Sequence, residues 1–261
     1  MYDYWHKQTK NNPKYPGAEW EKPERKDLAG KLLIVGGCQS GFRSVVEAYN
    51  MAQQNDIGEV KVVIPESLRK ITKDLPNVFY APANGTGSFS LGSADILLNL
   101  AQWADGVLLC GDYGRNSETA IVLSSLARSY KGLLTITKDA IDILNSEIIN
   151  LMNRPDTTLV CNYGQLQKIT KSLQDPRAFL HSDSLVQVVE HLHEITISHC
   201  ANIITKHIEY LITASNGEVT TNERSDLNDL WSLEIASRAA VALTHHKNKN
   251  AILPLSSVLM T

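Results

Sequence analysis

Short apolar runs alternate with amphipathic stretches along most of this chain. The apolar runs predict strands at residues 31–38, 59–65, 78–81, 107–110, 133–137, 158–161 and 201–206. The stretches with helical periodicity predict helices between them, at residues 44–54, 66–72, 92–103, 117–129 and 165–173. This order predicts an α/β protein, in which a mostly parallel sheet is covered by helices on both faces.

The last third of the chain departs from simple alternation. Residues 185–199 predict an amphipathic helix, whose inward positions are Leu185, Val188, Val189, Leu192, Ile195 and Thr196. Two strand-like runs, 210–214 and 218–221, flank Asn216-Gly217, and this dipeptide between β-rich runs predicts a hairpin. A final helix is expected from about residue 229 to residue 243.

Residues 104–144 form the clearest strand–turn–helix–strand unit. The strand ends at Cys110, after which Gly111 and Gly114 allow a tight turn, and Asn116 is suited to cap the next helix. The inward face of that helix is expected to carry Ile121, Leu123, Leu126 and Ala127. A turn at the end of a strand and the start of a helix favours phosphate or another anion. An equally weighted interpretation is that the glycines only turn the chain.

Two other motifs do not support a specific site. The turn after residues 31–38 lacks G-x-G-x-x-G, and Gly36-x4-Gly41 is followed by Phe42-Arg43, so neither a dinucleotide fingerprint nor a P-loop is present. His191, His193 and His199 share the helix 185–199 but lack a metal-binding spacing, so they are interpreted as solvated side chains.

Composition limits the classes of protein that fit. The formal net charge of −3 and the absence of a basic cluster argue against nucleic-acid binding. No apolar run approaches 18 residues and the first 30 residues lack a signal-peptide pattern, so no membrane association is expected. Four scattered cysteines predict reduced, mostly buried thiols and a cytoplasmic protein. Residues 1–30 are expected to form an aromatic arm that lies against its own domain or a partner subunit, or else a loose tail. Residues 31–261 are expected to form a single domain.

Several turns resemble motifs of the ribokinase-like superfamily, and within it the NAD(P)H-hydrate dehydratases. The Gly-Pro-Gly-Leu-Gly turn of that family resembles Gly111-Asp112-Tyr113-Gly114-Arg115, which lacks the proline. Its Asp-Ala-Asp-Ala strand end is similar to Thr137-Lys138-Asp139-Ala140, where the second Asp is kept. Its Thr-Pro-His-Pro-Gly-Glu turn is similar to residues 160–165, where Asn162 replaces the His and Gln165 replaces the Glu. Its Val-Leu-Lys-Gly strand resembles residues 203–207, where Lys206 keeps the lysine.

The catalytic motif differs more strongly. The family has Gly-x-Gly-Asp at the start of a helix, and the matching segment here is Asp226-Leu227-Asn228-Asp229, which keeps the Asp and loses both glycines. Glycines let the backbone approach a phosphate, and a lost donor of this kind typically costs about 100- to 1000-fold in rate. The two aspartates could instead cap the final helix without any chemistry.

The resemblance implies an ATP- or ADP-dependent NAD(P)H-hydrate dehydratase of ribokinase-like fold, which phosphorylates a hydrated nicotinamide cofactor and eliminates phosphate. Asp229 would be the catalytic base, and Mg²⁺ would accompany the nucleotide. The implied substrate-binding residues are Gly111, Asp112, Tyr113, Gly114, Arg115 and Asn162. The implied nucleotide-binding residues are Lys206, Asp139 and Asn228. The family habit also implies a homo-oligomer.

Two other functions fit the same residues. The altered motifs at Thr137, Asn162, Gln165 and Asn228 are consistent with a catalytically degenerate protein that binds a nucleotide or metabolite. Related folds also phosphorylate small sugars, pyrimidines or vitamins, so a small-molecule kinase is the third candidate.

Overall fold

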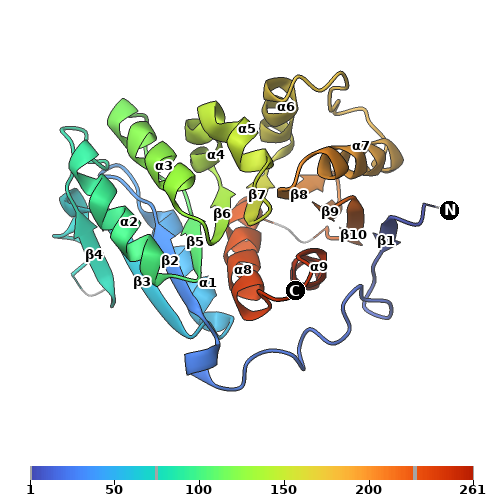
Figure 1. Cartoon of the computed structure of the whole chain (residues 1–261), viewed down its shortest axis with the longest axis horizontal. Helices are drawn as coiled ribbons and strands as arrows, with labels where there is room; N and C mark the ends of the chain where they lie inside the picture. The colour runs from blue at the N-terminus through green and yellow to red at the C-terminus, as the bar shows by residue number, and fades with distance from the viewer. Residues whose placement is uncertain (1, 74–75, 226–227, 261) are drawn as a thin grey trace.

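The computed structural model describes residues 2–73, 76–225 and 228–260, and its centre is a 10-stranded sheet (Figure 1). The strands are β1 (Trp5–Lys7), β2 (Lys31–Val35), β3 (Glu59–Pro65), β4 (Val78–Ala81), β5 (Gly106–Leu109), β6 (Leu133–Thr137), β7 (Thr157–Cys161), β8 (Asn202–His207), β9 (Tyr210–Ser215) and β10 (Glu218–Glu223). Their order across the sheet is β1-β10-β9-β8-β7-β6-β5-β2-β3-β4. Strands β2 to β8 pair in parallel, while β9 is antiparallel to both β8 and β10.

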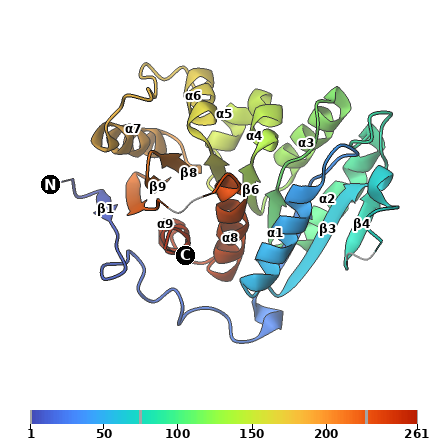
Figure 2. The ribbon, with the colours of Figure 1, turned by 180° about the vertical axis from the view of Figure 1, so that it is seen from behind.

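Helices cover both faces of the sheet (Figures 1 and 2). One face carries α2 (Ala94–Trp103), α3 (Ser117–Ser129), α4 (Asp139–Ile143), α5 (Ile148–Met152), α6 (Tyr163–Ser172) and α7 (Leu185–Ser198). The other face carries α1 (Arg43–Gln54), α8 (Trp231–His245) and α9 (Ile252–Val258). Short 3₁₀ turns lie at Lys26–Leu28, Glu66–Leu68, Leu91–Ser93 and Leu144–Glu147. None of the helices in the described ranges is long and apolar enough to cross a membrane.

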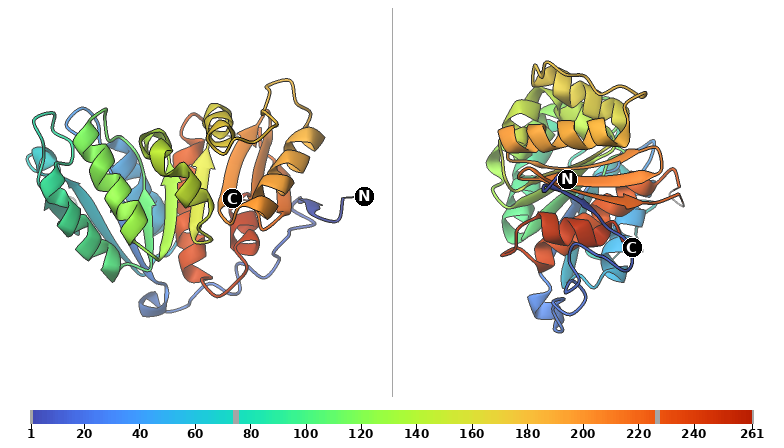
Figure 3. Two further views of the ribbon diagram at one scale, coloured as in Figure 1. Left: turned by 45° about the horizontal axis from the view of Figure 1, so that its top comes forward. Right: turned by 90° about the vertical axis from the view of Figure 1, so that its right-hand side faces the viewer.

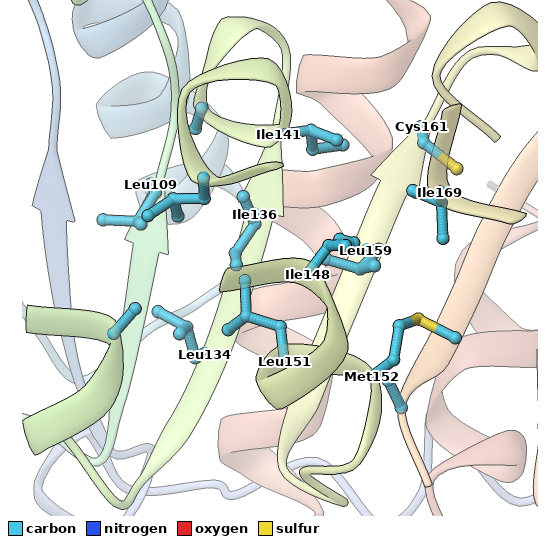
Figure 4. Close-up of a cluster of buried hydrophobic side chains, with 14 of the residues drawn as sticks. Leu109, Leu134, Ile136, Ile141, Ile148, Leu151, Met152, Leu159, Cys161 and Ile169 are labelled. Atoms are coloured by element: carbon cyan, nitrogen blue, oxygen red, sulfur yellow. The ribbon is translucent and has the colours of Figure 1, made fainter. Parts of the chain in front are cut away.

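Two apolar cores explain why the central strands are apolar at successive positions. Leu33 and Val35 of β2 contribute to the core under α2–α7, whereas Leu32 and Ile34 contribute to the core under α1 and α8. Successive side chains of a strand point to opposite faces, so a strand covered on both faces is apolar throughout. Figure 4 shows part of the first core, where side chains from β5, β6 and β7 meet those of α5 and α6.

Most of the predicted elements are confirmed. The strands at 59–65, 78–81 and 133–137 and the helix at 117–129 have the expected bounds. The hairpin turn also occurs where expected, with Asn216 and Gly217 at φ +48° and +78°. The expected helix at 66–72 is wrong, because only a short 3₁₀ turn forms there. The inward position given to Ile121 is also wrong, since its side chain is 58% exposed and Val122 is buried instead.

The N-terminal arm lies against its own chain. Its strand β1 pairs in parallel with β10, and the Trp5 indole donates to Thr221 Oγ1 at 2.9 Å. Further along the arm, the Gln8 side chain donates to the Ser256 carbonyl at 2.8 Å, and Ala18 is buried. The right-hand view of Figure 3 shows the hairpin strands between α7 above and α9 below, with β1 at their edge.

The structure corrects one interpretation of the histidines and confirms that of the cysteines. His191 is buried rather than solvated, because its ring stacks on Phe179 with centroids 4.1 Å apart. The thiols of Cys38, Cys110 and Cys161 are free and buried, as expected, and only Cys200 is exposed.

A buried carboxylate joins α3 to the segment before α5. Glu147 accepts hydrogen bonds from the Arg128 guanidinium, at 2.8 Å from its Nε, and from Asn150 Nδ2 at 3.1 Å. These donors, chiefly Arg128, hold the pKa of the Glu147 carboxyl below its ordinary value. A lowered folded-state pKa stabilises the fold above the unfolded-state pKa, and this stabilisation disappears as pH falls through the folded-state pKa.

We therefore expect Glu147→Gln to lower the Tm by roughly 3–6 °C near neutral pH. The difference from wild type should shrink as the pH falls below the unfolded-state pKa of the carboxyl and through its lower folded-state pKa, because the wild-type carboxyl then becomes protonated as well. Thermal melts across this pH range measure both effects. Glu19→Gln is the control, since the Glu19–Lys22 pair is exposed and should change the Tm little at any pH. An equal effect of the two substitutions would contradict the prediction.

Candidate functional site at the carboxyl ends of the strands

The start of α8 and the turn after β5 lie at the same edge of the sheet. Thr137, at the carboxyl end of β6, donates from Oγ1 to the carbonyls of Val160 at 3.0 Å and Ser232 at 3.4 Å. Ser232 is in the first turn of α8, whereas Thr244 in its last turn packs on Gly106, at the opposite end of β5. Helix α8 therefore begins where the parallel strands end, the position at which open α/β sheets bind ligands.

The carboxylate of Asp139 fixes the backbone of the turn after β5. Asp139 Oδ1 accepts from the Asp112 N–H at 2.8 Å, and its Oδ2 accepts from the Tyr113 N–H at 2.9 Å. Burial raises the pKa of the Asp139 carboxyl, while the two N–H donors partly offset this effect. Gly111 adopts φ +98°, and a Cβ there would lie 2.7 Å from Asp139 Oδ1 and 2.8 Å from Lys138 Cβ. Only glycine fits this close approach without displacing Lys138 and Asp139.

Asp112 connects this turn to the start of α1. Its φ is +63°, and its Oδ2 accepts from the Ser44 N–H at 2.8 Å. The Lys138 ammonium lies 3.1 Å from Asp112 Oδ1 and also donates to Ser44 Oγ. Burial works to raise the pKa of the Asp112 carboxyl, but these donors outweigh it and hold that pKa below its ordinary value.

Lys138 is a site residue that the sequence reasoning missed. It has φ +55°, and its carbonyl accepts from Gln165 Nε2 at 2.7 Å. Non-glycine residues with positive φ are uncommon, and strained backbone of this kind concentrates at functional sites. The available signal was a lysine directly after a predicted strand, at the edge where ligands bind. Its left-handed backbone could not be read from the sequence.

The other members of the 111–115 turn differ in exposure. The Tyr113 ring is fully buried, and its hydroxyl donates to the Val35 carbonyl at 2.7 Å, so this side chain faces the core and not a ligand. Gly114 adopts φ +71° and packs near Ser88. Arg115 is exposed at the end of the turn. Asn116 caps α3, as expected, by accepting from the Glu118 N–H at 2.8 Å.

Asn162 caps a helix in the structure. Its Oδ1 accepts from the Gln165 N–H at 2.9 Å, and the Asn162 N–H donates to Gln165 Oε1 at 3.2 Å. This reciprocal pair is a capping box at the start of α6. The side-chain oxygen is therefore committed to the helix.

We expect Asn162→Ala to destabilise the protein by about 1 kcal/mol, because the Gln165 N–H loses its side-chain acceptor. Asn162→Asp keeps the acceptor oxygen and should remain within about 0.5 kcal/mol of wild type. Urea unfolding of the two variants measures the difference. Equal losses of stability would show that the hydrogen bond from Gln165 is not what stabilises this helix start.

The remaining predicted residues lie near the carboxyl ends of the parallel strands. Lys206 is half-buried near the carboxyl end of β8, and Asp229 is exposed in the turn before α8. Asn228 Oδ1 accepts from the Leu230 N–H at 2.8 Å, and its carbonyl accepts from the Trp231 N–H at 3.2 Å. Asn228 therefore closes the turn that leads into α8, whose N-cap residue, Leu230, has no side-chain capping bond. Asp226 lies outside the described residues.

No group of three or more His, Cys, Asp or Glu side chains that could hold a metal ion occurs within the described residues. Two of the larger cavities lie away from the 111–115 turn. One of about 470 Å³ lies between the ends of α3 and α5, and another of about 740 Å³ lies beside β1 and β10.

Comparison with known proteins shows which solved structures share this fold. No family model matches the sequence, and no curated protein matches it significantly. The structure superposes on a ribokinase-like superfamily protein from Enterococcus faecalis with a TM-score of 0.72 and 13% identity, over 99% of this chain and 86% of that chain. The chain has the ribokinase-like fold. Its layers, mostly parallel sheet and C-terminal hairpin agree with the expected fold class.

Two further structures show the functional range of proteins with this fold. One is an ADP/ATP-dependent NAD(P)H-hydrate dehydratase from Bacillus subtilis, co-crystallised with ATP and Mg²⁺. It has a TM-score of 0.61 and 12% identity, over 95% of the present chain and 87% of the dehydratase chain. A hydroxyethylthiazole kinase from Pyrococcus horikoshii has a TM-score of 0.56 and 8% identity, over 93% and 80% of the two chains. At these identities the likeness concerns the fold.

Proposed function

We propose that this chain binds ATP or ADP at the carboxyl edge of the sheet and transfers a phosphoryl group to the hydroxyl of a small molecule. The first candidate substrate is a hydrated nicotinamide cofactor, from which phosphate is then eliminated to restore NAD(P)H. The main support is that three consecutive residues, 137–139, contact both the start of α8 and the turn after β5. Thr137 contacts the start of α8, while Lys138 and Asp139 hold the turn after β5. The candidate base and the candidate substrate turn therefore share one rim.

Asp229 is the proposed catalytic base. Asp229 is exposed, and Asn228 closes the turn before α8, so the Asp229 carboxylate is left for chemistry. It takes the proton from the substrate hydroxyl while the hydroxyl oxygen forms a bond to the terminal phosphorus of the nucleotide. The bond from that phosphorus to its bridging oxygen breaks, and its electron pair leaves with the shortened nucleotide.

The other proposed residues divide into contacts and supports. Gly111 lets Asp139 and Lys138 pack closely against the proposed substrate turn, Gly114 is the proposed point at which a substrate approaches the backbone, and Arg115 offers an exposed cation to a phosphate. Lys206 and Asn228 are the proposed nucleotide contacts. Asp139 is better described as a positioning residue, because both of its oxygens already accept backbone N–H groups.

Magnesium would be held mainly by the nucleotide. Mg²⁺ is commonly bound through substrate phosphates, with one or two carboxylates and several waters. When bound, the ion would neutralise the charge on the transferring phosphoryl group.

Catalytic degeneracy is the second candidate, and a specific observation favours it. Asp112 places a carboxylate at the start of α1, and Asn228 fills donors at the start of α8, so both helix starts are occupied by the protein's own acceptors. A phosphate would have to displace them. A protein of this kind would bind a nucleotide or metabolite without turnover.

Purified protein incubated with hydrated NADH and either ATP or ADP tests the proposal. Recovery of the reduced nicotinamide's absorbance, together with equimolar release of phosphate, would support the dehydratase. Nucleotide binding by calorimetry without release of phosphate would support the degenerate alternative. Phosphate transfer to another hydroxyl compound in a substrate screen would identify a small-molecule kinase.

A further inference from the structure

Strand β4 forms the edge of the sheet at the end opposite β1 (Figures 1 and 2). The Val62 N–H donates to the Asn77 carbonyl at 3.0 Å, and Val62 is aligned with Val78. In a parallel ladder this register turns alternate main-chain groups of β4 toward β3, so those of Val78 and Tyr80 point away from the sheet. No N–H or carbonyl of the other described residues pairs with them. Unpaired main-chain groups along an edge are a template for another strand.

Cationic side chains lie on both faces of this edge. Lys61 Nζ is 5.5 Å from the centroid of the Phe79 ring, and the Arg69 guanidinium carbon is 4.7 Å from the centroid of the Tyr80 ring. Phe79 and Tyr80 are consecutive residues of β4, so their side chains point to opposite faces of the sheet. Each face therefore presents one cation held against an aromatic ring of the edge strand.

The positive charge around β4 is left without ion pairs. Lys61, Arg69 and the exposed Lys70 and Lys73 form none within the part of the chain that the structure describes. Glu66, at the start of the same segment, is directed to the loop after β4, where it accepts a main-chain N–H at 3.3 Å. Pairing of β4 with β4 of a second copy would bring like charges together, which is unfavourable. An acidic strand has the complementary charge.

Exposed apolar side chains accompany these cations. Phe79 is 38% exposed and Ile71 is 62% exposed. Ile71 precedes Thr72, whose hydroxyl lies 3.1 Å from the Tyr80 hydroxyl, so this segment is held beside β4. The side chains of an added strand alternate between the two faces, where apolar ones can cover these residues and acidic ones can meet the cations.

We propose that β4 is a docking edge for an acidic, extended segment of a partner protein, which adds to the sheet as a further strand. The backbone of that segment pairs with the outward N–H and carbonyl groups of Val78 and Tyr80, which supplies affinity. Its acidic side chains meet Lys61 on one face and Arg69 on the other, which supplies specificity. Strands β2 and β3 separate β4 from β5, and this docking does not depend on the proposed phosphoryl transfer.

NMR of protein labelled with ¹⁵N-tyrosine tests the docking edge directly. The chain has nine tyrosines, and the Tyr80 amide is assigned with Tyr80→Phe. The probe is the peptide acetyl-Val-Glu-Glu-Val-Glu-Glu-amide, which should move the Tyr80 amide resonance because that N–H gains an acceptor. A peptide with lysine in place of every glutamate should not move it. The acidic peptide N-methylated at its two central residues keeps its charge but loses strand pairing, so it should bind about tenfold more weakly or worse.

Paired charge variants provide the control on the protein side. Lys61→Gln/Arg69→Gln should weaken binding of the acidic peptide about fivefold or more, because two exposed ion pairs are lost. Lys10→Gln/Lys171→Gln removes the same charge at exposed positions after β1 and in α6, and should leave binding unchanged.

Sedimentation of the protein without peptide tests the other occupant of this edge. A dimer that dissociates on dilution, with a change in the Tyr80 amide resonance, would make β4 an interface between copies and overturn the proposal. The proposal is also overturned if Tyr80 does not respond to the acidic peptide at millimolar concentration. Equal binding of the N-methylated or lysine peptide, or equal behaviour of the two double variants, would overturn it as well.

Discussion

Asp229→Asn should reduce nucleotide-dependent turnover by about 100-fold or more, because the amide cannot accept the proton of the substrate hydroxyl. The change is isosteric and the side chain is exposed, so the Tm should stay close to that of wild type. Nucleotide affinity should also be retained, since the proposed nucleotide contacts are other residues. The measurement is kcat with hydrated NADH and ATP or ADP, alongside calorimetry with the nucleotide alone.

Asp95→Asn is the matched control for this substitution. Asp95 is likewise an exposed aspartate at the start of a helix, but that helix is α2, which covers the opposite face of the sheet from α8. It should leave kcat unchanged. Full turnover in Asp229→Asn would remove Asp229 from the mechanism. Absence of turnover in the wild-type protein, with nucleotide still bound, would favour the degenerate alternative.

Gly111→Ala should destabilise the protein by about 2–4 kcal/mol. Alanine is strained at φ +98°, and its Cβ would overlap Asp139 Oδ1 and Lys138 Cβ. The fall in Tm should be roughly 5–15 °C. Turnover should fall as well, even though Asp229 is untouched, because Asp139 positions the backbone of the substrate turn.

Gly41→Ala separates this local cause from a general effect of replacing glycine. A Cβ at Gly41 meets no atom within 4 Å, and its backbone is outside the left-handed region. It should change stability by less than about 0.5 kcal/mol. Thermal and urea unfolding of both variants provide the comparison. If Gly111→Ala were as stable as Gly41→Ala, the close approach of residues 111, 138 and 139 would be wrong.

Strong periodicity made the layers of this fold predictable, and weak local signals explain what was missed. Buried strands such as 133–137 are largely apolar, and the dipeptide Asn216-Gly217 by itself predicts a hairpin turn. The three-residue β1 has no pattern of its own and exists through pairing with β10. His191 is buried because Phe179, from the segment between α6 and α7, covers it, and helical spacing cannot show that contact.

The candidate site was predictable in place but not in detail. Parallel strands put the turns after residues 110, 137 and 161 at one edge, and the structure brings them together there. The sequence could not show that Asp112 and Lys138 adopt positive φ, because neither is glycine. Nor could it show that Asn162 is taken up by a capping box.

Because β1 pairs with β10, the first strand can dock only late in the synthesis of the chain. The Trp5–Thr221 hydrogen bond joins residues 216 positions apart, so its partner does not exist until most of the chain has left the ribosome. Contacts between such distant positions close large loops and form slowly. The leading segment of a nascent chain must therefore wait undocked, and a product of premature termination before β10 could never complete this edge.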